Sequence, residues 1–303
     1  MACTKCLEHP VIDLSNSNRS LCESCFVKYF EKKVMRTIQK YKLVEEHDRI
    51  GIAVSGGKDS FSVLYLLSKL QKKYKNIEVI GIAVDEGIES YRSLELLKKY
   101  CAEHQLELHT FSFKEEFSFT LDDALKKTSM KACSVCGVLR RTVLNKKARE
   151  LKVNKLATGH NLDDEAQSVM MNYLRGDLLR STRLGPKTSK VKDPRFIPRI
   201  KPLYFMSEKE VATYAFIKKF PVKFNECPNT ADSYRNSVRD VMNEFELKYP
   251  GTKHAIIASF LEVLPSFVET FKGVSAHECV YCGEPSSQDV CNTCKVVESL
   301  KKA

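Results

Sequence analysis

The sequence predicts an α/β fold: a doubly wound parallel sheet flanked by a small zinc ribbon at each terminus. Two observations support this prediction. In the middle of the 303-residue sequence, short apolar runs alternate with segments of helical periodicity, which is the pattern of βαβ units. Near both termini, cysteines occur as two C-x2-C pairs, a spacing typical of four-thiolate zinc sites. We therefore expect an N-terminal ribbon at 1–27, a large domain at 28–275 with a helical C-terminal part, and a C-terminal ribbon at 276–303.

The large domain begins with alternating strands and helices. Strands are predicted at 49–54, 78–84, 106–112 and 155–158. Helices are predicted at 58–74, 93–104, 134–151 and 163–174. Beyond residue 200 the pattern is mostly helical, at 207–219, 231–249 and 253–271. The intervening residues 176–201 are rich in Arg, Lys and Pro, so we expect them to form a loop.

The composition argues against a membrane protein and favours a nucleic-acid partner. No apolar run approaches the ~18 residues that a membrane span needs, and the N-terminus lacks the apolar core of a secretion signal. We therefore expect a cytoplasmic protein whose 12 cysteines stay reduced, as metal ligands or reactive thiols. The protein has 49 Lys and Arg against 38 Asp and Glu, and the net charge of +11 suits a polyanion.

The segment Ser55-Gly56-Gly57-Lys58-Asp59-Ser60 lies between the first predicted strand and the first predicted helix. A helix N-terminus offers free N–H groups and a positive dipole end, and glycines let the backbone approach an anion closely. The segment differs from the G-x4-G-K-[ST] loop that cradles phosphates for γ-phosphoryl transfer. It predicts a different kind of phosphate-binding loop, and the alternative is a glycine-rich turn with a serine cap.

A second polar segment, Gly159-His160-Asn161-Leu162-Asp163-Asp164, follows the fourth predicted strand and opens a helix. The carboxyl ends of parallel strands line the ligand crevice of a doubly wound sheet, so this segment should face the first loop. Its paired carboxylates, Asp163 and Asp164, suit Mg²⁺ held together with phosphate oxygens. The alternative is an acidic helix start that complements the helix dipole.

Eight cysteines form the terminal quartets. They are Cys3, Cys6, Cys22 and Cys25, spaced C-x2-C-x15-C-x2-C, and Cys279, Cys282, Cys291 and Cys294, spaced C-x2-C-x8-C-x2-C. Four thiolates close a tetrahedral Zn²⁺ site and leave no open position for a substrate. We therefore predict two structural zinc ions, with iron or redox dithiols as the alternatives.

Three further cysteines indicate chemistry. Cys133 and Cys136 form a C-x2-C pair near the middle of the sequence, and Cys227 stands alone before a proline. Three thiolates can hold a [4Fe–4S] cluster and leave one iron open to another ligand. Alternatively, they can carry a persulfide and resolve it as a disulfide, or the pair can be incidental. Cys101 has no partner at a motif spacing, and we expect it to be a core residue.

Basic residues are concentrated between residues 175 and 201. They are Arg175, Arg180, Arg183, Lys187, Lys190, Lys192, Arg195, Arg199 and Lys201, against Asp177 and Asp193. Such an excess suits contacts with RNA phosphates, and a solvated charged loop is the alternative. Arg235 and Arg239 are one helical turn apart and are further candidates for phosphate contacts, with a salt-bridged surface as the alternative.

Taken in order, these motifs resemble those of the tRNA 2-thiolation enzymes. The shared features are the N-terminal C-x2-C pairs, SGGKDS, CSVCGVLRR, GHNLDDE, a later lone cysteine and a C-terminal C-x2-C ribbon. These enzymes belong to the PP-loop ATP pyrophosphatase superfamily, whose fold is of the adenine nucleotide α-hydrolase type. The resemblance covers essentially the whole sequence and implies that 28–275 is the catalytic domain.

The resemblance also implies roles for individual residues. The loop from Ser55 to Ser60 would bind the phosphates of ATP, and Asp59 and Asp164 would be Mg²⁺ ligands or catalytic carboxylates. The nucleotide would be lined by Ala53, Val54, Ala83, Gly159, Asp163 and Asp164. The [4Fe–4S] ligands would be Cys133, Cys136 and Cys227, with Arg140 or Arg141 at the reacting centre.

The implied reaction replaces O2 of a tRNA uridine by sulfur, after ATP has adenylated that oxygen and released pyrophosphate. Wobble uridine 34 is favoured; the alternatives are uridine 54, cytidine 32, and a persulfide mechanism without a cluster. An amidating ligase would not need three thiols, and a non-catalytic RNA-binding adaptor would not need an intact nucleotide loop. The partners implied are tRNA, a sulfur donor (sulfide or a thiocarboxylated ubiquitin-like carrier protein), and a second copy if the ribbons mediate a homodimer.

Overall fold

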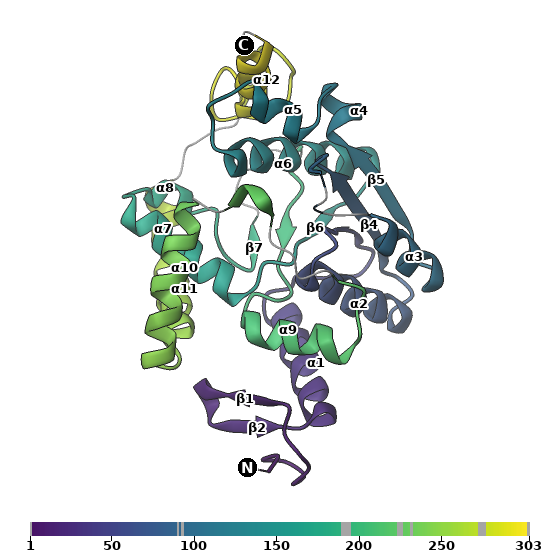
Figure 1. Cartoon of the computed structure of the whole chain (residues 1–303), viewed down its shortest axis with the longest axis vertical. Coiled ribbons are helices and arrows are strands. Elements are labelled where there is room, and N and C mark those ends of the chain that lie inside the picture. The colour runs from purple at the N-terminus through teal and green to yellow at the C-terminus, as the bar shows by residue number, and fades with distance from the viewer. Residues whose placement is uncertain are drawn as a thin grey trace.

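The computed structural model describes residues 2–89, 91, 94–188, 195–222, 227–230, 233–271 and 277–301. Its centre is a six-stranded sheet in the order β5-β4-β3-β6-β8-β7 (Figure 1). The strands are β3 (Arg49–Ala53), β4 (Glu78–Asp85), β5 (Leu108–Ser112), β6 (Lys155–Ala157), β7 (Lys187–Thr188) and β8 (Arg199–Ile200). All neighbouring strands are parallel except β7 and β8. The predicted α/β class is therefore confirmed.

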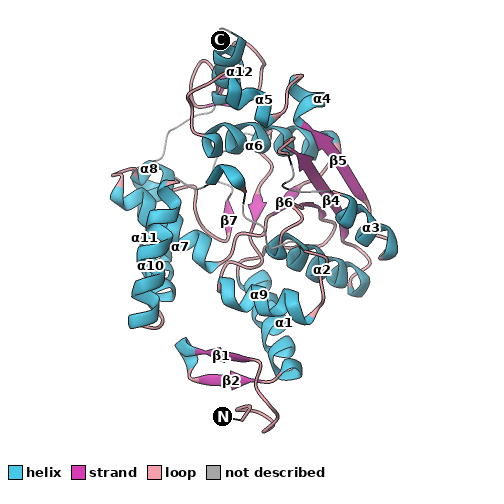
Figure 2. Ribbon diagram, viewed as in Figure 1, coloured by secondary structure: helices cyan, strands magenta, loops and turns pink. Residues whose placement is uncertain are grey.

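Helices cover both faces of the sheet, as a doubly wound fold requires (Figure 2). They are α1 (Glu23–Lys40), α2 (Lys58–Lys73), α3 (Glu95–Glu103), α6 (Ala132–Glu150) and α9 (Glu208–Ile217). Helices α2 and α3 pack on one face, with α9 and α1 outside α2. On the other face, Ala148 of α6 packs against Ile80 and Ile82. Because both faces are covered, β4 is buried over six consecutive residues instead of alternating.

A helical layer follows the sheet in sequence. Helices α7 (Leu162–Leu174), α10 (Tyr234–Lys248) and α11 (Thr252–Thr270) share one apolar core that includes Val169 and Phe260. The predicted helices in this region are thus confirmed to within a few residues, although 231–232 lie outside the described residues. No helix among the described residues is both long enough and apolar enough to cross a bilayer.

The cysteine-rich segments lie at opposite ends of the molecule (Figure 1). The N-terminal segment is a hairpin of β1 (Ile12–Leu14) and β2 (Arg19–Leu21), joined by η1 (Ser15–Ser17), and it leads into α1. The C-terminal segment pairs β9 (His277–Glu278) with β10 (Pro285–Ser286) and ends in α12 (Asn292–Lys301). Val296 and Leu300 of α12 are buried in one cluster with Val135 and Leu139 of α6. The C-terminal ribbon therefore supports the helix that carries Cys133 and Cys136.

The structure differs from the sequence expectation in its short elements. The expected loop at 176–201 contains α8 (Leu178–Ser181), β7 and β8, because two-residue strands are too short to show an alternating pattern. The unpredicted helices α4 (Phe113–Phe117) and α5 (Leu121–Lys126) begin with capping boxes at Ser112 and Thr120. Helix α1 was also unpredicted and continues through residue 27, while the expected boundary at 275/276 lies outside the described residues.

The two loops that carry the nucleotide motifs meet where the strand order reverses. The sequence proceeds from β3 to β4 and β5 on one side, whereas β6 lies on the other side of β3. Ligands of doubly wound sheets bind at the carboxyl ends of strands at this switch point. A Cβ added to Gly159, after β6, would lie 2.9 Å from the Asp59 carbonyl carbon and from the Ser60 nitrogen. Only glycine fits between these two loops.

We predict that Gly159→Ala lowers the free energy of unfolding by about 1–3 kcal/mol, because the new methyl group meets backbone atoms that cannot move aside. Gly57→Ala is the control, since the Cβ there meets nothing nearer than 3.6 Å and should cost well under 1 kcal/mol. Urea unfolding measures both, and equal midpoints for the two variants would contradict the prediction.

Candidate active site and metal centres

The phosphate-binding loop is closed by its own hydrogen bonds. After β3, Gly56 takes φ +77°, a conformation that favours glycine, and Gly57 is the N-cap of α2. The Ser60 hydroxyl accepts from the Ser55 N–H at 3.2 Å and donates to the Gly57 carbonyl at 2.9 Å. The Lys58 ammonium contacts Asp59 at 3.1 Å. The loop therefore presents the start of α2 to the crevice, as an anion-binding site requires.

Asn161 joins this loop to the turn after β6. Its Nδ2 donates to Asp59 Oδ1 at 2.9 Å, and its Oδ1 accepts from the Asp164 N–H at 3.1 Å. Asp59 and Asp164 thus face one site from two elements. Desolvation, and then the negative charge of Asp59, raise the pKa of Asp164 to about 6. Two carboxylates that repel each other in this way suit a shared cation.

Asp163 points away from that site. One of its oxygens accepts from the Glu208 N–H at 2.8 Å, and the other contacts the ammonium of Lys253. The Asp163 residue is 6% exposed. Its carboxylate therefore ties the start of α7 to α9 and α11 and has no oxygen left for a metal ion in the crevice.

Three expected nucleotide-lining residues differ in accessibility. Ala53 is half-buried at the end of β3. Val54 and Ala83 are 2% and 0% exposed, so they shape the sheet beneath the crevice and offer it no surface in this structure.

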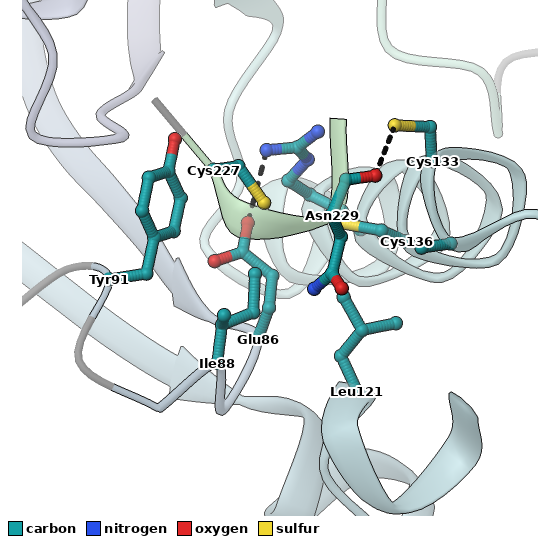
Figure 3. Close-up of a pocket in the computed structure, with 10 residues that line it drawn as sticks. Glu86, Ile88, Tyr91, Leu121, Cys133, Cys136, Cys227 and Asn229 are labelled. Carbon is teal, nitrogen blue, oxygen red and sulfur yellow. Dashed lines mark hydrogen bonds and ion pairs between the residues drawn. The ribbon is translucent and has the colours of Figure 1, made fainter. Parts of the chain in front are cut away.

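Cys133, Cys136 and Cys227 line one pocket of about 190 Å³ (Figure 3). Cys133 and Cys136 lie on the first turns of α6, and Cys227 precedes the short helix η2 (Pro228–Thr230). The Cys133 sulfur donates to the Asn229 carbonyl at 3.8 Å. The other lining residues are Glu86, Ile88, Tyr91, Leu121, Ala132, Asn229 and Arg140. Cysteines from distant parts of the sequence thus meet as the sequence predicted.

Arg140 enters the pocket through an ion pair with Glu86. The Arg140 guanidinium and the Glu86 carboxylate are 3.0 Å apart, and the Glu86 side chain is only 9% exposed. Glu86 directly follows β4, so its place at the carboxyl edge of the sheet is set by the strand. Desolvation raises the pKa of the Cys136 thiol to about 11, against the opposing charge of Arg140.

The pocket and the nucleotide loop are neighbours at the same edge of the sheet. Desolvation lowers the pKa of His160, in the turn after β6, and nearby cations that include Arg199 and Arg140 lower it further. Arg140 also lines the cysteine pocket. Glu86 of the pocket follows β4 and the nucleotide loop follows the adjacent strand β3, so both candidate sites lie at the carboxyl ends of neighbouring strands.

The donor set of the pocket fits an iron–sulfur cluster better than a single ion. Among the described residues, the only groups whose ligand atoms all lie within 4.8 Å of one another are the two terminal quartets. The three pocket sulfurs do not meet this limit, so they are more widely spaced than the ligands of one ion. Thiolates that bind different irons of one cluster stand farther apart than thiolates that share a single ion. Three thiols also leave one iron of a [4Fe–4S] cluster without a protein ligand.

Both terminal quartets fit a tetrahedral metal ion. Within each, the four sulfurs lie within 4.8 Å of one another. The separation of Cys279 from Cys294 is 3.8 Å and that of Cys282 from Cys291 is 3.7 Å. Four sulfurs at the Zn–S bond length stand about 3.8 Å apart at tetrahedral angles. A backbone N–H donated by Cys22 lowers the pKa of Cys3 to about 6, which favours the thiolate that a metal needs.

The basic residues at 175–201 serve different purposes. Lys187 is near Glu45 at 3.5 Å, Arg195 pairs with Glu278, and Lys201 pairs with buried Glu165 at 2.7 Å. Lys190, Lys192 and Asp193 lie outside the described residues.

The second pair of candidate phosphate contacts is engaged within the protein. Arg235 contacts Asp164, Gln167 and Ser168, and so holds α10 on α7. Arg239 lies 3.5 Å from Asp240.

The sequence reasoning missed three residues of these sites. Asn161 lies within a recognised motif but was given no role, and Glu86 and Asn229 were not considered. Glu86 could have been found from its place directly after a buried strand, since such positions line the crevice. Asn229 contributes through its backbone carbonyl, which no pattern of residue types reveals.

Comparison with known proteins identifies the family. Residues 28–245 match the PP-loop domain family. The protein is 34% identical to the tRNA 2-thiolation protein NcsA of Haloferax volcanii, over 99% of each of the two sequences. It is 36% identical to the tRNA-5-methyluridine(54) 2-sulfurtransferase of Pyrococcus horikoshii, over 97% of this sequence and 93% of that one.

A solved structure is similar over the same length. It is the U34-tRNA thiolase NcsA from Methanococcus maripaludis with its [4Fe–4S] cluster, with a TM-score of 0.85 and 35% identity, and the match includes 99% of this protein and 96% of that one. It therefore spans the central sheet and both cysteine quartets. On sequence, fold and site together, this protein belongs to the PP-loop family of tRNA 2-thiolation proteins.

Proposed function

We propose that this protein is a tRNA 2-thiouridine synthetase, which replaces O2 of a uridine by sulfur at the expense of ATP. Membership of the tRNA sulfurtransferases sets the reaction class. The observation that supports the proposal most is a juxtaposition at one edge of the sheet. The Asp59–Asn161–Asp164 contact completes a nucleotide site there, and a three-cysteine pocket lies beside it.

The nucleotide site suits the first half of the reaction. The N–H groups at the start of α2 and the ammonium of Lys58 would hold the phosphates of ATP. Asp59 and Asp164 would hold Mg²⁺, which neutralises charge on the released pyrophosphate. Attack of the uridine oxygen on the α-phosphorus breaks the bond to the β-phosphate. The oxygen then belongs to AMP, which leaves far more readily than oxide.

The cysteine pocket suits the second half. Cys133, Cys136 and Cys227 would hold a [4Fe–4S] cluster, whose fourth iron supplies a Lewis-acid position for a sulfur atom. Glu86 orients Arg140, and the guanidinium offers positive charge to the departing AMP phosphate. A persulfide relay through the same thiols is the alternative chemistry. Sulfide or a thiocarboxylated ubiquitin-like carrier protein would supply the sulfur.

Several finer assignments complete the proposal. The modified position is wobble uridine 34, with uridine 54 as the alternative. Zn²⁺ occupies both terminal quartets, which form ribbons at 1–27 and 276–303 around a catalytic domain at 28–275. The protein is cytoplasmic, where its thiols stay reduced. Mass spectrometry of nucleosides from tRNA treated with the anaerobically reconstituted protein tests the position directly.

We predict that Cys133→Ala, Cys136→Ala and Cys227→Ala each abolish thiolation while ATP binding stays within about twofold, because the thiols lie outside the phosphate-binding loop. Cys101→Ala is the matched control, since this thiol is 1% exposed in the core and faces neither site. Thiolated nucleoside per tRNA is the readout. A pocket variant that retains thiolation would remove its cysteine from the mechanism.

We predict that Asp59→Asn slows tRNA-dependent pyrophosphate release by about 100-fold or more, because a neutral amide cannot hold Mg²⁺ beside the phosphates. Glu103→Gln, an exposed change on α3, is the control for loss of one negative charge. Normal pyrophosphate release by Asp59→Asn would show that this carboxylate is dispensable.

We predict that the purified full-length protein contains about two zinc ions per molecule, and that Cys279→Ser loses about one of them. The loss should also lower the melting temperature, since small ribbons depend on metal for much of their folding free energy. Elemental analysis measures the content, with Cys101→Ser as the control. Iron in place of zinc in these quartets would contradict the assignment.

A further inference from the structure

Two arginines, Arg141 and Arg199, take no part in the ion pairs that join the described residues. Arg141 lies on α6 directly after Arg140, and Arg199 lies on β8. Among the described residues, neither guanidinium forms an ion pair with a carboxylate, although Arg140 does. Both arginines therefore keep their full positive charge at the carboxyl edge of the sheet.

Backbone contacts bring these two arginines together. The Arg195 carbonyl accepts from Asn145 and from Arg149 of α6, and the Ile197 N–H donates to Asn145 at 3.1 Å. The backbone therefore runs toward the N-terminus of α6 as it enters β8. Along the extended backbone, Arg199 is two residues beyond Ile197, which is an advance of about 6.6 Å. Along α6, Arg141 is four residues before Asn145, which is an advance of about 6 Å in the same direction.

Arg141 is also held in place by its own helix. A Cβ built on Gly137 would lie 3.2 Å from Nη1 of Arg141 and 3.5 Å from Nη2. The guanidinium thus lies over the bare backbone of Gly137, one turn toward the cysteine end of α6. A Cβ at residue 137 would require the guanidinium to shift by a few tenths of an ångström.

The charges of these arginines interact. Desolvation, and then the charge of Arg141, lower the pKa of Arg199 to about 10. Desolvation lowers the pKa of Arg141 as well, and Arg140 and Arg180 add to that effect. Arg199 is half-buried and Arg141 is exposed, so a solvent-borne anion can reach both guanidinium groups and offset their mutual repulsion.

We propose that Arg141 and Arg199 together form a phosphate-binding site beside the cysteine pocket, and that its ligand is one phosphodiester of the bound RNA. In the proposed function, the phosphates of ATP are already bound by the loop at 55–60, which includes Lys58. A base that enters the cysteine pocket leaves its backbone at the rim, and two guanidinium forks suit a phosphate there. The identity of the RNA rests on the proposed function.

The test compares Arg141→Gln and Arg199→Gln with Lys98→Gln, an exposed change of equal charge on α3. Binding of an unmodified tRNA transcript to the full-length protein is measured against salt concentration. Each arginine variant should weaken binding by about tenfold at low salt and reduce the slope of log K against log salt by up to about one. The double variant should lose less than the product of the two single losses, because both arginines share one phosphate.

A second arm separates RNA phosphate from nucleotide phosphate. The affinity for a non-hydrolysable ATP analogue without tRNA should stay within about twofold in both variants. Loss of ATP-analogue affinity with normal tRNA binding would overturn the RNA assignment and give the site to the nucleotide. Wild-type values in both measurements, or losses equal to those of Lys98→Gln, would overturn the site itself.

Gly137→Ala provides a variant in which a loss of tRNA binding cannot be attributed to misfolding. Alanine in place of helical glycine should leave the melting temperature unchanged or raise it. Its methyl group should nevertheless displace Arg141 and weaken tRNA binding by several-fold. Normal binding by Gly137→Ala would contradict this placement of Arg141. If the wild-type protein binds no tRNA at all, the proposed function fails, and that outcome is distinct from loss of this site alone.

Discussion

The close approach of two loops at the switch point of the sheet organises the rest of the molecule. Gly159 has no Cβ, so the turn after β6 can lie against the start of α2, and Asn161 then reaches Asp59. The same asparagine caps α7 and so fixes Asp164. Two carboxylates from distant parts of the sequence are thereby placed within one crevice. A methyl group between the two loops would separate these carboxylates.

Charged side chains gather at two places along the carboxyl edge of the sheet. Asp59 and Asp164 lie at the nucleotide loop, where Lys58 and Arg235 contact them, and Arg140 lines the cysteine pocket. Glu86 pairs with Arg140, and no carboxylate of the described residues pairs with its neighbour Arg141. Metal-bound phosphates and an RNA backbone would therefore approach different stretches of the same crevice, which keeps two polyanions from competing for one set of cations.

Sequence reasoning was most reliable where a residue type carries its own chemistry. The two quartets and the loop at 55–60 could be inferred from spacing and order, whereas the convergence of Cys133, Cys136 and Cys227 was implied by the resemblance to the tRNA 2-thiolation enzymes. Sequence reasoning failed where the packing of helices decides which hydrogen-bond and ion-pair partners a side chain has. The sequence predicted Asp163 and Asp164 as equals, but Lys253 and a backbone N–H claim the first of them. The two-residue strand β8, which orients Arg199, leaves no periodic trace.

The packing of α12 on α6 couples the C-terminal cysteine quartet to the cysteine pocket. On the proposed assignment, the ribbon around Cys279 depends on its ion to hold α12 in place. Val296 and Leu300 of α12 share one apolar cluster with Val135 and Leu139 of α6, the helix that bears Cys133 and Cys136. Ribbon and helix start would then open as one cooperative unit. On the proposed assignment of zinc to this quartet, a shortage of zinc in the cell would therefore reach the cysteine pocket by way of this helix, although zinc has no place in the proposed reaction.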